Sequence, residues 1–184
     1  MHKVAVLGAA GYAGALCAEL VHSHPQLQLV HATARSDEGV RLNELYPRYR
    51  CDITFSKYDP AIIAADADAV LVAYPHGAAA PVVAEMLASG LKVVDLSADF
   101  RLQQDRYEDY YQPHEAPALL ADAVYGLTEL NRDAVARAQL VANPGCYPTA
   151  SLLGLLPVAD LIADVVVDAK SGVSGAGRAA NDAS

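Results

Sequence analysis

The start of the chain, an apolar segment followed at once by a glycine-rich turn, constrains the fold most. Residues 4–7 are apolar, as in a buried parallel strand, and residues 15–21 have the composition of a helix. Three regularly spaced glycines stand between them: Gly8, Gly11 and Gly14. Such a turn lets the backbone approach a pyrophosphate, whose charge the helix N-terminus receives. This order predicts an α/β fold with a doubly wound parallel sheet of the Rossmann type.

The glycine spacing leaves a second interpretation open. It is Gly-x-x-Gly-x-x-Gly and not the commoner Gly-x-Gly-x-x-Gly, and it would also suit a turn that only packs the helix closely on the strand. The position directly after the first strand favours a dinucleotide site. The predicted cofactor contacts in this turn are Gly8, Gly11, Tyr12 and Gly14.

The end of the second predicted strand, residues 26–32, indicates which dinucleotide binds. NAD sites usually carry Asp or Glu there, on the ribose 2′-hydroxyl group, whereas an arginine accommodates a 2′-phosphate. This chain has hydroxyl groups and an arginine, which favour NADP: Thr33, Arg35 and Ser36. Alternatively, Arg35 is a solvated loop cation. Two acidic residues nearby argue against NADP: Asp37 and Glu38.

The rest of the chain continues the alternation of strands and helices. Apolar runs predict strands at 51–55, 69–73, 91–96, 139–142 and 165–169. Helices are expected at 78–89 and 132–138, the second with Asn131 as its N-cap. Residues 105–125 are rich in tyrosine and acids, and we expect them to form a surface excursion.

Cys146 stands between two prolines, where a predicted strand ends and a predicted helix, residues 150–156, follows. Pro148 suits the first helical turn, because its missing N–H would have no partner there. A helix N-terminus offers free N–H groups and a partial positive charge, which favour the nucleophilic thiolate. Cys146 is therefore the candidate catalytic nucleophile; the alternative is a small buried cysteine at a tight turn. The other cysteines, Cys17 and Cys51, are expected to be structural.

Other polar residues follow predicted strands, at the edge where open α/β sheets bind ligands. Arg101 would hold an anionic group of a substrate, or else pair with Asp95 or Asp99. Asn143 is the second candidate for substrate binding. His76 either borders the cofactor or serves as a loop or capping histidine.

Composition limits the partners of the chain. Its 184 residues carry a formal net charge of −9, which argues against nucleic acid, because nucleic-acid binders need a basic footprint. Its three cysteines are widely spaced and odd in number, so we expect no disulfide framework, no metal site and a reducing, cytoplasmic setting. The chain begins directly with a strand and has no apolar run of membrane length, so we expect no signal peptide and no membrane partner.

Five motifs, in this order, resemble the N-acetyl-gamma-glutamyl-phosphate reductase family. The resemblance covers residues 4–178; the cysteine motif and the last motif are its specific parts, and the first is shared with aspartate-semialdehyde dehydrogenase. The motifs are Gly8-Ala-Ala-Gly-Tyr-Ala-Gly14, Val94-Asp-Leu-Ser-Ala-Asp-Phe-Arg101, Tyr125-Gly-Leu-Thr-Glu-Leu-Asn131, Asn143-Pro-Gly-Cys-Tyr-Pro-Thr149 and Ser171-Gly-Val-Ser-Gly-Ala-Gly-Arg178.

The resemblance implies an NADP-dependent oxidoreductase of arginine biosynthesis. Cys146 would attack the acyl carbon of a small acyl phosphate, phosphate would leave, and hydride from NADPH would reduce the thioester to N-acetylglutamate 5-semialdehyde. The resemblance also implies a Rossmann domain over 1–147 and the start of an α+β catalytic and dimerisation domain over 148–184, hence a homo-oligomer of the full-length enzyme. In the second glycine-rich loop, Ser174 and Gly175 would face the nicotinamide end of the cofactor.

The chain departs from the family in length. Family members are about twice as long, and their acid/base histidine lies in a His-x-His segment after the second glycine-rich loop. None of the six histidines of this chain matches that segment. We therefore expect an N-terminal portion that binds NADP and turns over poorly alone.

Other functions remain open at this point. A sister reductase acting on an aminoadipyl or aspartyl phosphate would share the motifs. A non-catalytic NADP-binding module would leave Cys146 inert. A cysteine hydrolase would need a histidine partner and no dinucleotide, which the glycine turn argues against.

Overall fold

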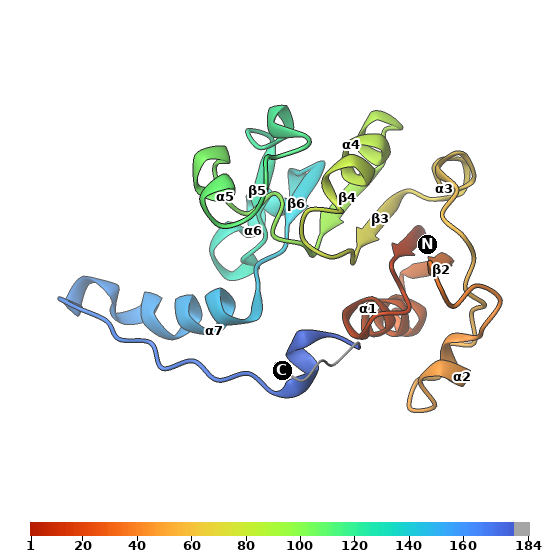
Figure 1. Ribbon diagram of the computed structural model, residues 1–184, viewed down its shortest axis with the longest axis horizontal. Coiled ribbons are helices and arrows are strands. Elements are labelled where there is room, and N and C mark those ends of the chain that lie inside the picture. Colours follow the sequence, from red (N-terminus) through yellow and green to blue (C-terminus); the bar gives the residue numbers. More distant parts are fainter. Residues whose placement is uncertain (179–184) are drawn as a thin grey trace.

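Six parallel strands form one sheet in the computed structural model, which describes residues 1–178 (Figure 1). They are β1 (His2–Leu7), β2 (Leu27–Thr33), β3 (Ala69–Val72), β4 (Lys92–Asp95), β5 (Ala123–Tyr125) and β6 (Leu140–Ala142). Their spatial order is β2-β1-β3-β4-β6-β5. Strands are added on one side of β1 up to β2 and on its other side from β3 onward, so the space between β1 and β3 is a switch point of the kind where open α/β sheets bind ligands. The predicted Rossmann-type sheet is confirmed.

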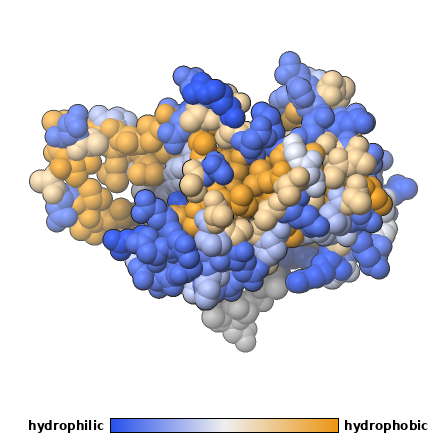
Figure 2. Space-filling view, turned by 90° about the horizontal axis from the view of Figure 1, so that it is seen from above, coloured by the Kyte–Doolittle hydropathy of each residue, from blue (hydrophilic) through white to orange (hydrophobic). Residues whose placement is uncertain are grey.

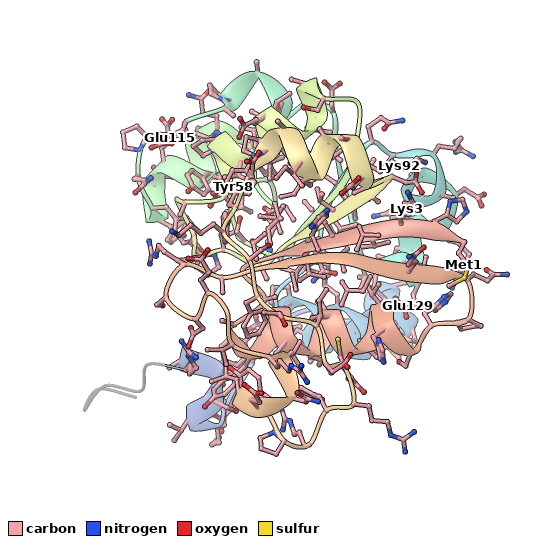
Figure 3. The ribbon with its side chains drawn as sticks, turned by 90° about the vertical axis from the view of Figure 1, so that its right-hand side faces the viewer. Met1, Lys3, Tyr58, Lys92, Glu115 and Glu129 are labelled. Atoms are coloured by element: carbon pink, nitrogen blue, oxygen red, sulfur yellow. The ribbon has the colours of Figure 1, made fainter. Side chains whose placement is uncertain are left out.

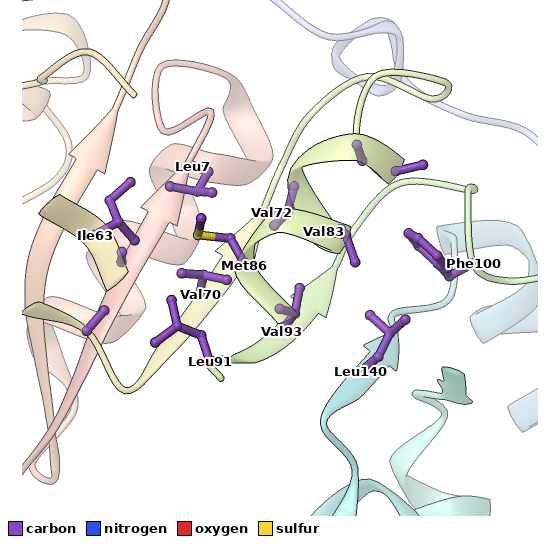
Figure 4. Close-up of a cluster of buried hydrophobic side chains, with 14 of the residues drawn as sticks. Leu7, Ile63, Val70, Val72, Val83, Met86, Leu91, Val93, Phe100 and Leu140 are labelled. Carbon is purple, nitrogen blue, oxygen red and sulfur yellow. The ribbon is translucent and has the colours of Figure 1, made fainter. Parts of the chain in front are cut away.

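Helices cover both faces of this sheet, as the side view shows for β1 and β2 (Figure 3). The helices are α1 (Tyr12–Ser23), α2 (Leu42–Leu45), α3 (Pro60–Asp66), α4 (Ala80–Ala88), α5 (Gln104–Tyr110), α6 (Thr128–Arg137) and α7 (Cys146–Leu155), with the 3-10 turns η1 (Pro117–Leu119), η2 (Leu156–Leu161) and η3 (Val173–Ala176). Successive side chains of a strand point to opposite faces. Val6 accordingly packs in a cluster with Ala15 of α1. Leu7 packs in the opposite cluster, with Ile63 of α3 and Val83 of α4 (Figure 4).

Most of residues 105–125 are exposed, in agreement with the predicted surface excursion, but the segment also has regular and buried parts. It contains α5, η1 and β5, the edge strand that pairs with β6. Tyr107 of α5 is 1% exposed, and its hydroxyl donates to Asp99 Oδ1 at 3.1 Å. A tyrosine ring can be buried when its hydroxyl finds such a partner. Asp99 lies outside residues 105–125, so the composition of that segment alone does not reveal the contact.

Three smaller expectations fail in whole or in part. The second part of α6 begins after a kink at Asn131, as expected, but the Asn131 side-chain amide donates to the Tyr125 carbonyl oxygen at 2.8 Å instead of capping it. Residues 51–55 make one isolated antiparallel bridge and no strand. Residues 165–169 pair with no strand within residues 1–178; a strand needs a neighbouring backbone to complete its hydrogen bonds.

The residues from α7 to η2 extend away from the sheet (Figure 1). Hydrophobic side chains gather on this extension (Figure 2). Leu161 is 85% exposed, and Val166, in the segment that follows, is 92% exposed. Such apolar surface is typical of a region that other protein covers.

The glycine turn after β1 has a packing role at two positions. Gly8 has φ +81°, and a Cβ atom there would lie 2.6 Å from the Ala73 carbonyl oxygen. A Cβ atom on Gly14 would overlap the Gly8 carbonyl oxygen and lie 2.9 Å from Ala9 Cα. At Gly11 the nearest atom would be 3.7 Å away. Gly8 and Gly14 therefore hold α1 against the strands, whereas Gly11 leaves the helix N-terminus open to a ligand.

We expect Gly14→Ala to lower the free energy of unfolding by about 1–3 kcal/mol, the usual cost of overpacking. A urea unfolding curve measures it. Gly154→Ala is the matched control, because Gly154 lies in α7 with nothing within 4 Å of its Cβ position. There alanine should stabilise the helix by up to about 1 kcal/mol. Equal effects at the two positions would contradict the packing role.

Candidate active site

The glycine turn and Cys146 lie at the same edge of the sheet. β1 ends at Leu7, directly before the turn, and β6 ends at Ala142, shortly before Cys146. Both strands belong to one all-parallel sheet, so both end at its carboxyl edge. Ligands of open α/β sheets bind along this edge.

Thr33, a predicted cofactor contact at the end of β2, is buried within the turn. The Gly8 N–H donates to its hydroxyl oxygen at 3.4 Å. The Thr33 side chain therefore stabilises the turn. The neighbouring candidates, Arg35 and Ser36, are exposed and can be reached by a ligand.

The two acidic residues that argue against NADP are both paired with cations. The Arg178 guanidinium donates to both carboxylate oxygens of Asp37, at 2.7 and 3.1 Å, and holds the pKa of Asp37 below its ordinary value. Lys57 Nζ lies 3.1 Å from Glu38 Oε2. The negative charge beside Arg35 is thereby offset.

The second glycine-rich loop returns to the N-terminus of α1 (Figure 1). Ser174 in this loop and Tyr12 in the glycine turn line one pocket of about 600 Å³. Tyr46 lines the same pocket, and its hydroxyl donates to the Ala10 carbonyl oxygen at 2.7 Å. Gly175 is an exposed residue of η3. The structure thus brings Ser174 beside a predicted cofactor contact that is far from it in sequence.

Cys146 is exposed and is the first residue of α7. Gly145 precedes it as an extended N-cap, and the first helical hydrogen bond runs from the Thr149 N–H to the Gly145 carbonyl oxygen at 3.0 Å. The N–H groups before Thr149 are therefore available to a ligand. The helix begins earlier than predicted, with Pro148 in its first turn as expected.

Arg101 lies against the turn that carries Cys146. Its Nε donates to the Asn143 carbonyl oxygen at 2.7 Å, and its Nη2 donates to the Leu96 carbonyl oxygen at 2.6 Å. A Cβ atom on Gly145 would lie 3.0 Å from Arg101 Nη1, so the guanidinium packs directly against this glycine. Within residues 1–178, the alternative ion pair with a nearby acid is not formed. Arg101 fixes the turn and places a cation near the cysteine.

Two other candidates are held by hydrogen bonds in the same region. The Asn143 N–H donates to the Asp95 carbonyl oxygen at 2.8 Å, and its side-chain amide donates to the Pro144 carbonyl oxygen at 3.1 Å. His76 Nδ1 accepts the Ala98 N–H at 2.8 Å. Burial, followed by the charge of Arg101, lowers the pKa of His76. These contacts favour the interpretation of His76 as a loop histidine.

A buried acidic network after β4 was missed by the sequence analysis, which treated Asp95 and Asp99 only as partners for Arg101. Both carboxylates are fully buried, and Ser97 between them is too. Asp99 accepts N–H groups at the start of α4, while Asp95 accepts the Ser97 hydroxyl at 2.6 Å and the Ser97 N–H at 3.0 Å. The Asp-x-Ser-x-Asp spacing, which begins at the last residue of β4, is the signal that could have suggested it.

Asp95 should make stability depend on pH. Burial raises the pKa of Asp95 from 3.8 to about 6, so the folded chain retains a proton that the unfolded chain has released. The stabilisation that the protonated Asp95 gives to the folded state is fully present below the pKa of the unfolded chain. It is lost as pH rises through the pKa of the folded chain, a change of roughly 2–3 kcal/mol in the free energy of unfolding. We expect Asp95→Asn to flatten the dependence of the free energy of unfolding on pH between about 4 and 6. Parallel curves for the two chains would refute this assignment.

Within residues 1–178, no group of three or more His, Cys, Asp or Glu side chains is arranged to hold a metal ion. In the same part of the chain, no helix has the length and apolar character needed to cross a membrane.

Comparison with known families finds two matches along the chain. Residues 3–138 match the family model described as "Semialdehyde dehydrogenase, NAD binding domain". Residues 146–184 match "Semialdehyde dehydrogenase, dimerisation domain"; residues 179–184 of this match lie outside the described part of the structure. The first match covers most of the chain.

Curated relatives carry one of the names considered above. The N-acetyl-gamma-glutamyl-phosphate reductase of Syntrophobacter fumaroxidans is 48% identical, covering 97% of this chain and 54% of the relative. That of Ectopseudomonas mendocina is 47% identical, covering 98% of this chain and 55% of the relative. The chain therefore spans about half the length of these relatives.

Solved structures share the fold at low sequence identity. Aspartate semialdehyde dehydrogenase II from Vibrio cholerae has a TM-score of 0.70 and 20% identity, covering 98% of this chain and 49% of that chain. The enzyme from Candida albicans, solved with NADP, has a TM-score of 0.61 and 16% identity, covering 88% of this chain and 47% of that chain.

Proposed function

Because the chain belongs to the semialdehyde dehydrogenase family, we propose that it carries the cofactor site and the nucleophile of an N-acetyl-gamma-glutamyl-phosphate reductase of arginine biosynthesis. The observation that supports this most is the position of Cys146, exposed at the first position of α7 on the same sheet edge as the glycine turn. A nucleophile and a dinucleotide at one edge suit a reaction in which a covalent intermediate is reduced. The names of relatives at 47–48% identity support the choice of substrate.

In the proposed reaction, the Cys146 thiolate attacks the acyl carbon of N-acetylglutamyl 5-phosphate. Inorganic phosphate leaves, and the acyl group remains on the sulfur as a thioester. The N–H groups at the start of α7 stabilise the negative charge that develops on the substrate oxygen. Arg101 and Asn143 hold the turn and are the candidate contacts for the substrate. NADPH, when bound, supplies the hydride that converts the thioester to the semialdehyde and frees the thiolate.

We propose NADP as the cofactor, with Gly8, Gly11, Tyr12 and Gly14 at its pyrophosphate, Arg35 and Ser36 at its 2′-phosphate, and Ser174 and Gly175 nearer its nicotinamide end. The open space at Gly11 supports the first assignment. The ion pairs of Asp37 and Glu38 support the second, because they offset charges that would repel a phosphate. The NADP complex of a relative in fold agrees with this choice.

Titration of the chain with NADPH and NADH, followed by nucleotide fluorescence, tests the cofactor. We expect NADPH to bind at least about tenfold more tightly, a difference of about 1.4 kcal/mol. Arg35→Ala should weaken NADPH binding and leave NADH binding unchanged, because only NADPH carries the 2′-phosphate. Equal binding of the two nucleotides would contradict the NADP assignment.

We also propose a domain boundary near residue 147, a cytoplasmic location and a homo-oligomeric full-length enzyme. The two family matches meet close to this boundary, and the second describes a dimerisation domain. The exposed apolar side chains after α7 suit a surface that the rest of such a domain covers. The three cysteines are free, which agrees with a reducing compartment.

A further inference from the structure

The ion pair between Arg178 and Asp37 joins the end of the second glycine-rich loop to the segment that follows β2. The residues are 141 positions apart, and both terminal nitrogens of the arginine contact the two carboxylate oxygens, at 3.1 and 2.7 Å. This two-point geometry is the strong form of an arginine–carboxylate contact. The Asp37 side chain is only 19% exposed.

The neighbouring ion pair provides a contrast. Lys57 meets Glu38 through one nitrogen, and the two side chains are 76% and 48% exposed. Exposed single contacts of this type contribute little, because water and salt screen them. The Asp37 carboxylate is therefore fixed by its ion pair, whereas the Glu38 carboxylate is not.

The position of Asp37 explains why its contact with Arg178 can affect binding of the cofactor. It lies directly after Ser36, four residues beyond the end of β2, beside the candidate contacts for the 2′-phosphate. Acidic residues near the end of this strand favour NAD, because they accept a hydrogen bond from the ribose 2′-hydroxyl group. A free carboxylate here would repel a 2′-phosphate. The two oxygens of Asp37 are instead occupied by the guanidinium of Arg178.

We propose that Arg178 determines the cofactor preference of this site, by occupying the Asp37 carboxylate, whose free charge would repel a 2′-phosphate bound at Arg35 and Ser36. This inference rests on the proposed NADP-binding function. Arg178 acts through Asp37 and is therefore a positioning residue.

The test measures the dissociation constants of NADPH and NADH for four chains: the wild type, Arg178→Ala, Asp37→Asn and the double variant. We expect Arg178→Ala to lower the preference for NADPH over NADH by about tenfold or more, because it releases the Asp37 charge. Asp37→Asn alone should retain the preference. The double variant should recover most of it, since the charge that Arg178 offsets is then absent.

A matched control and the contrary outcomes complete the test. Lys57→Ala releases Glu38, and we expect it to change the preference by less than about twofold, as for an exposed pair. If Arg178→Ala weakens the binding of NADPH and of NADH equally, Arg178 only positions the second glycine-rich loop. The inference then fails, while the proposed function stands. The inference is also overturned if Arg178→Ala keeps the wild-type preference for NADPH over NADH, or if the double variant does not recover that preference. A wild-type chain that prefers neither nucleotide contradicts both the NADP assignment and this inference.

Discussion

Replacing Cys146 with serine is expected to abolish reduction of the acyl phosphate in a chain that extends over the full length of the relatives. We expect kcat to fall by at least about a thousandfold, because the hydroxyl group is a far weaker nucleophile than the thiolate and no thioester forms. Binding of NADPH should stay unchanged, since Cys146 is outside the glycine turn. Activity that survives this substitution would show that another residue carries the acyl group.

Alkylation of the present chain tests the same residue without turnover. Iodoacetamide should modify Cys146 faster than Cys17 and Cys51, because Cys146 is exposed and the other thiols are partly or fully buried. Burial also raises the pKa of Cys17 and of Cys51, which lowers their thiolate content. Mass spectrometry of peptides over a time course measures the three rates. Equal rates would refute a special reactivity of Cys146.

Replacing Asp99 with alanine is expected to give the largest loss of stability in the sheet domain, roughly 3–5 kcal/mol. Asp99 is fully buried and accepts N–H groups from Gly77, Ala79 and Ala80, at 2.7 to 3.2 Å. The Tyr107 hydroxyl donates to it as well. Without the carboxylate, these donors stay buried with no acceptor. Urea unfolding measures the change in free energy.

Asp59→Ala is the matched control for this loss. Asp59 caps α3 and accepts the N–H groups of Ala61 and Ile62, but it does so in contact with solvent. Water can replace its carboxylate, so the expected cost is about 1 kcal/mol. If both substitutions cost the same, Asp99 serves only as a helix cap and the buried network contributes nothing further.

The local parts of this protein could be predicted from residues that are adjacent in the chain. The strand, turn and helix around Gly8 and Gly14 follow from an apolar run, small residues and helical periodicity, all within one short stretch. The same holds for Cys146, whose place between a strand and a helix is set by its flanking prolines and apolar segments. Both predictions placed these residues at the carboxyl edge of the sheet, because the carboxyl ends of parallel strands all lie at that edge.

Contacts between distant segments were decided only by the tertiary structure. Composition suggested that residues 105–125 lie on the surface, yet β5 pairs with β6 and Tyr107 is buried against Asp99. The strand expected at 165–169 found no partner within residues 1–178. Burial and pairing depend on what lies opposite a segment, and local composition does not specify it.

The cofactor site divides in the same way. The sequence by itself determined that a glycine-rich turn and a helix N-terminus follow the first strand, and that Arg35 and Ser36 follow the second. It left Asp37 as an argument against NADP. Only the folded chain brings Arg178 onto Asp37 across 141 positions, because the charge of a side chain is fixed by its type, whereas the charge that offsets it is fixed by the path of the backbone.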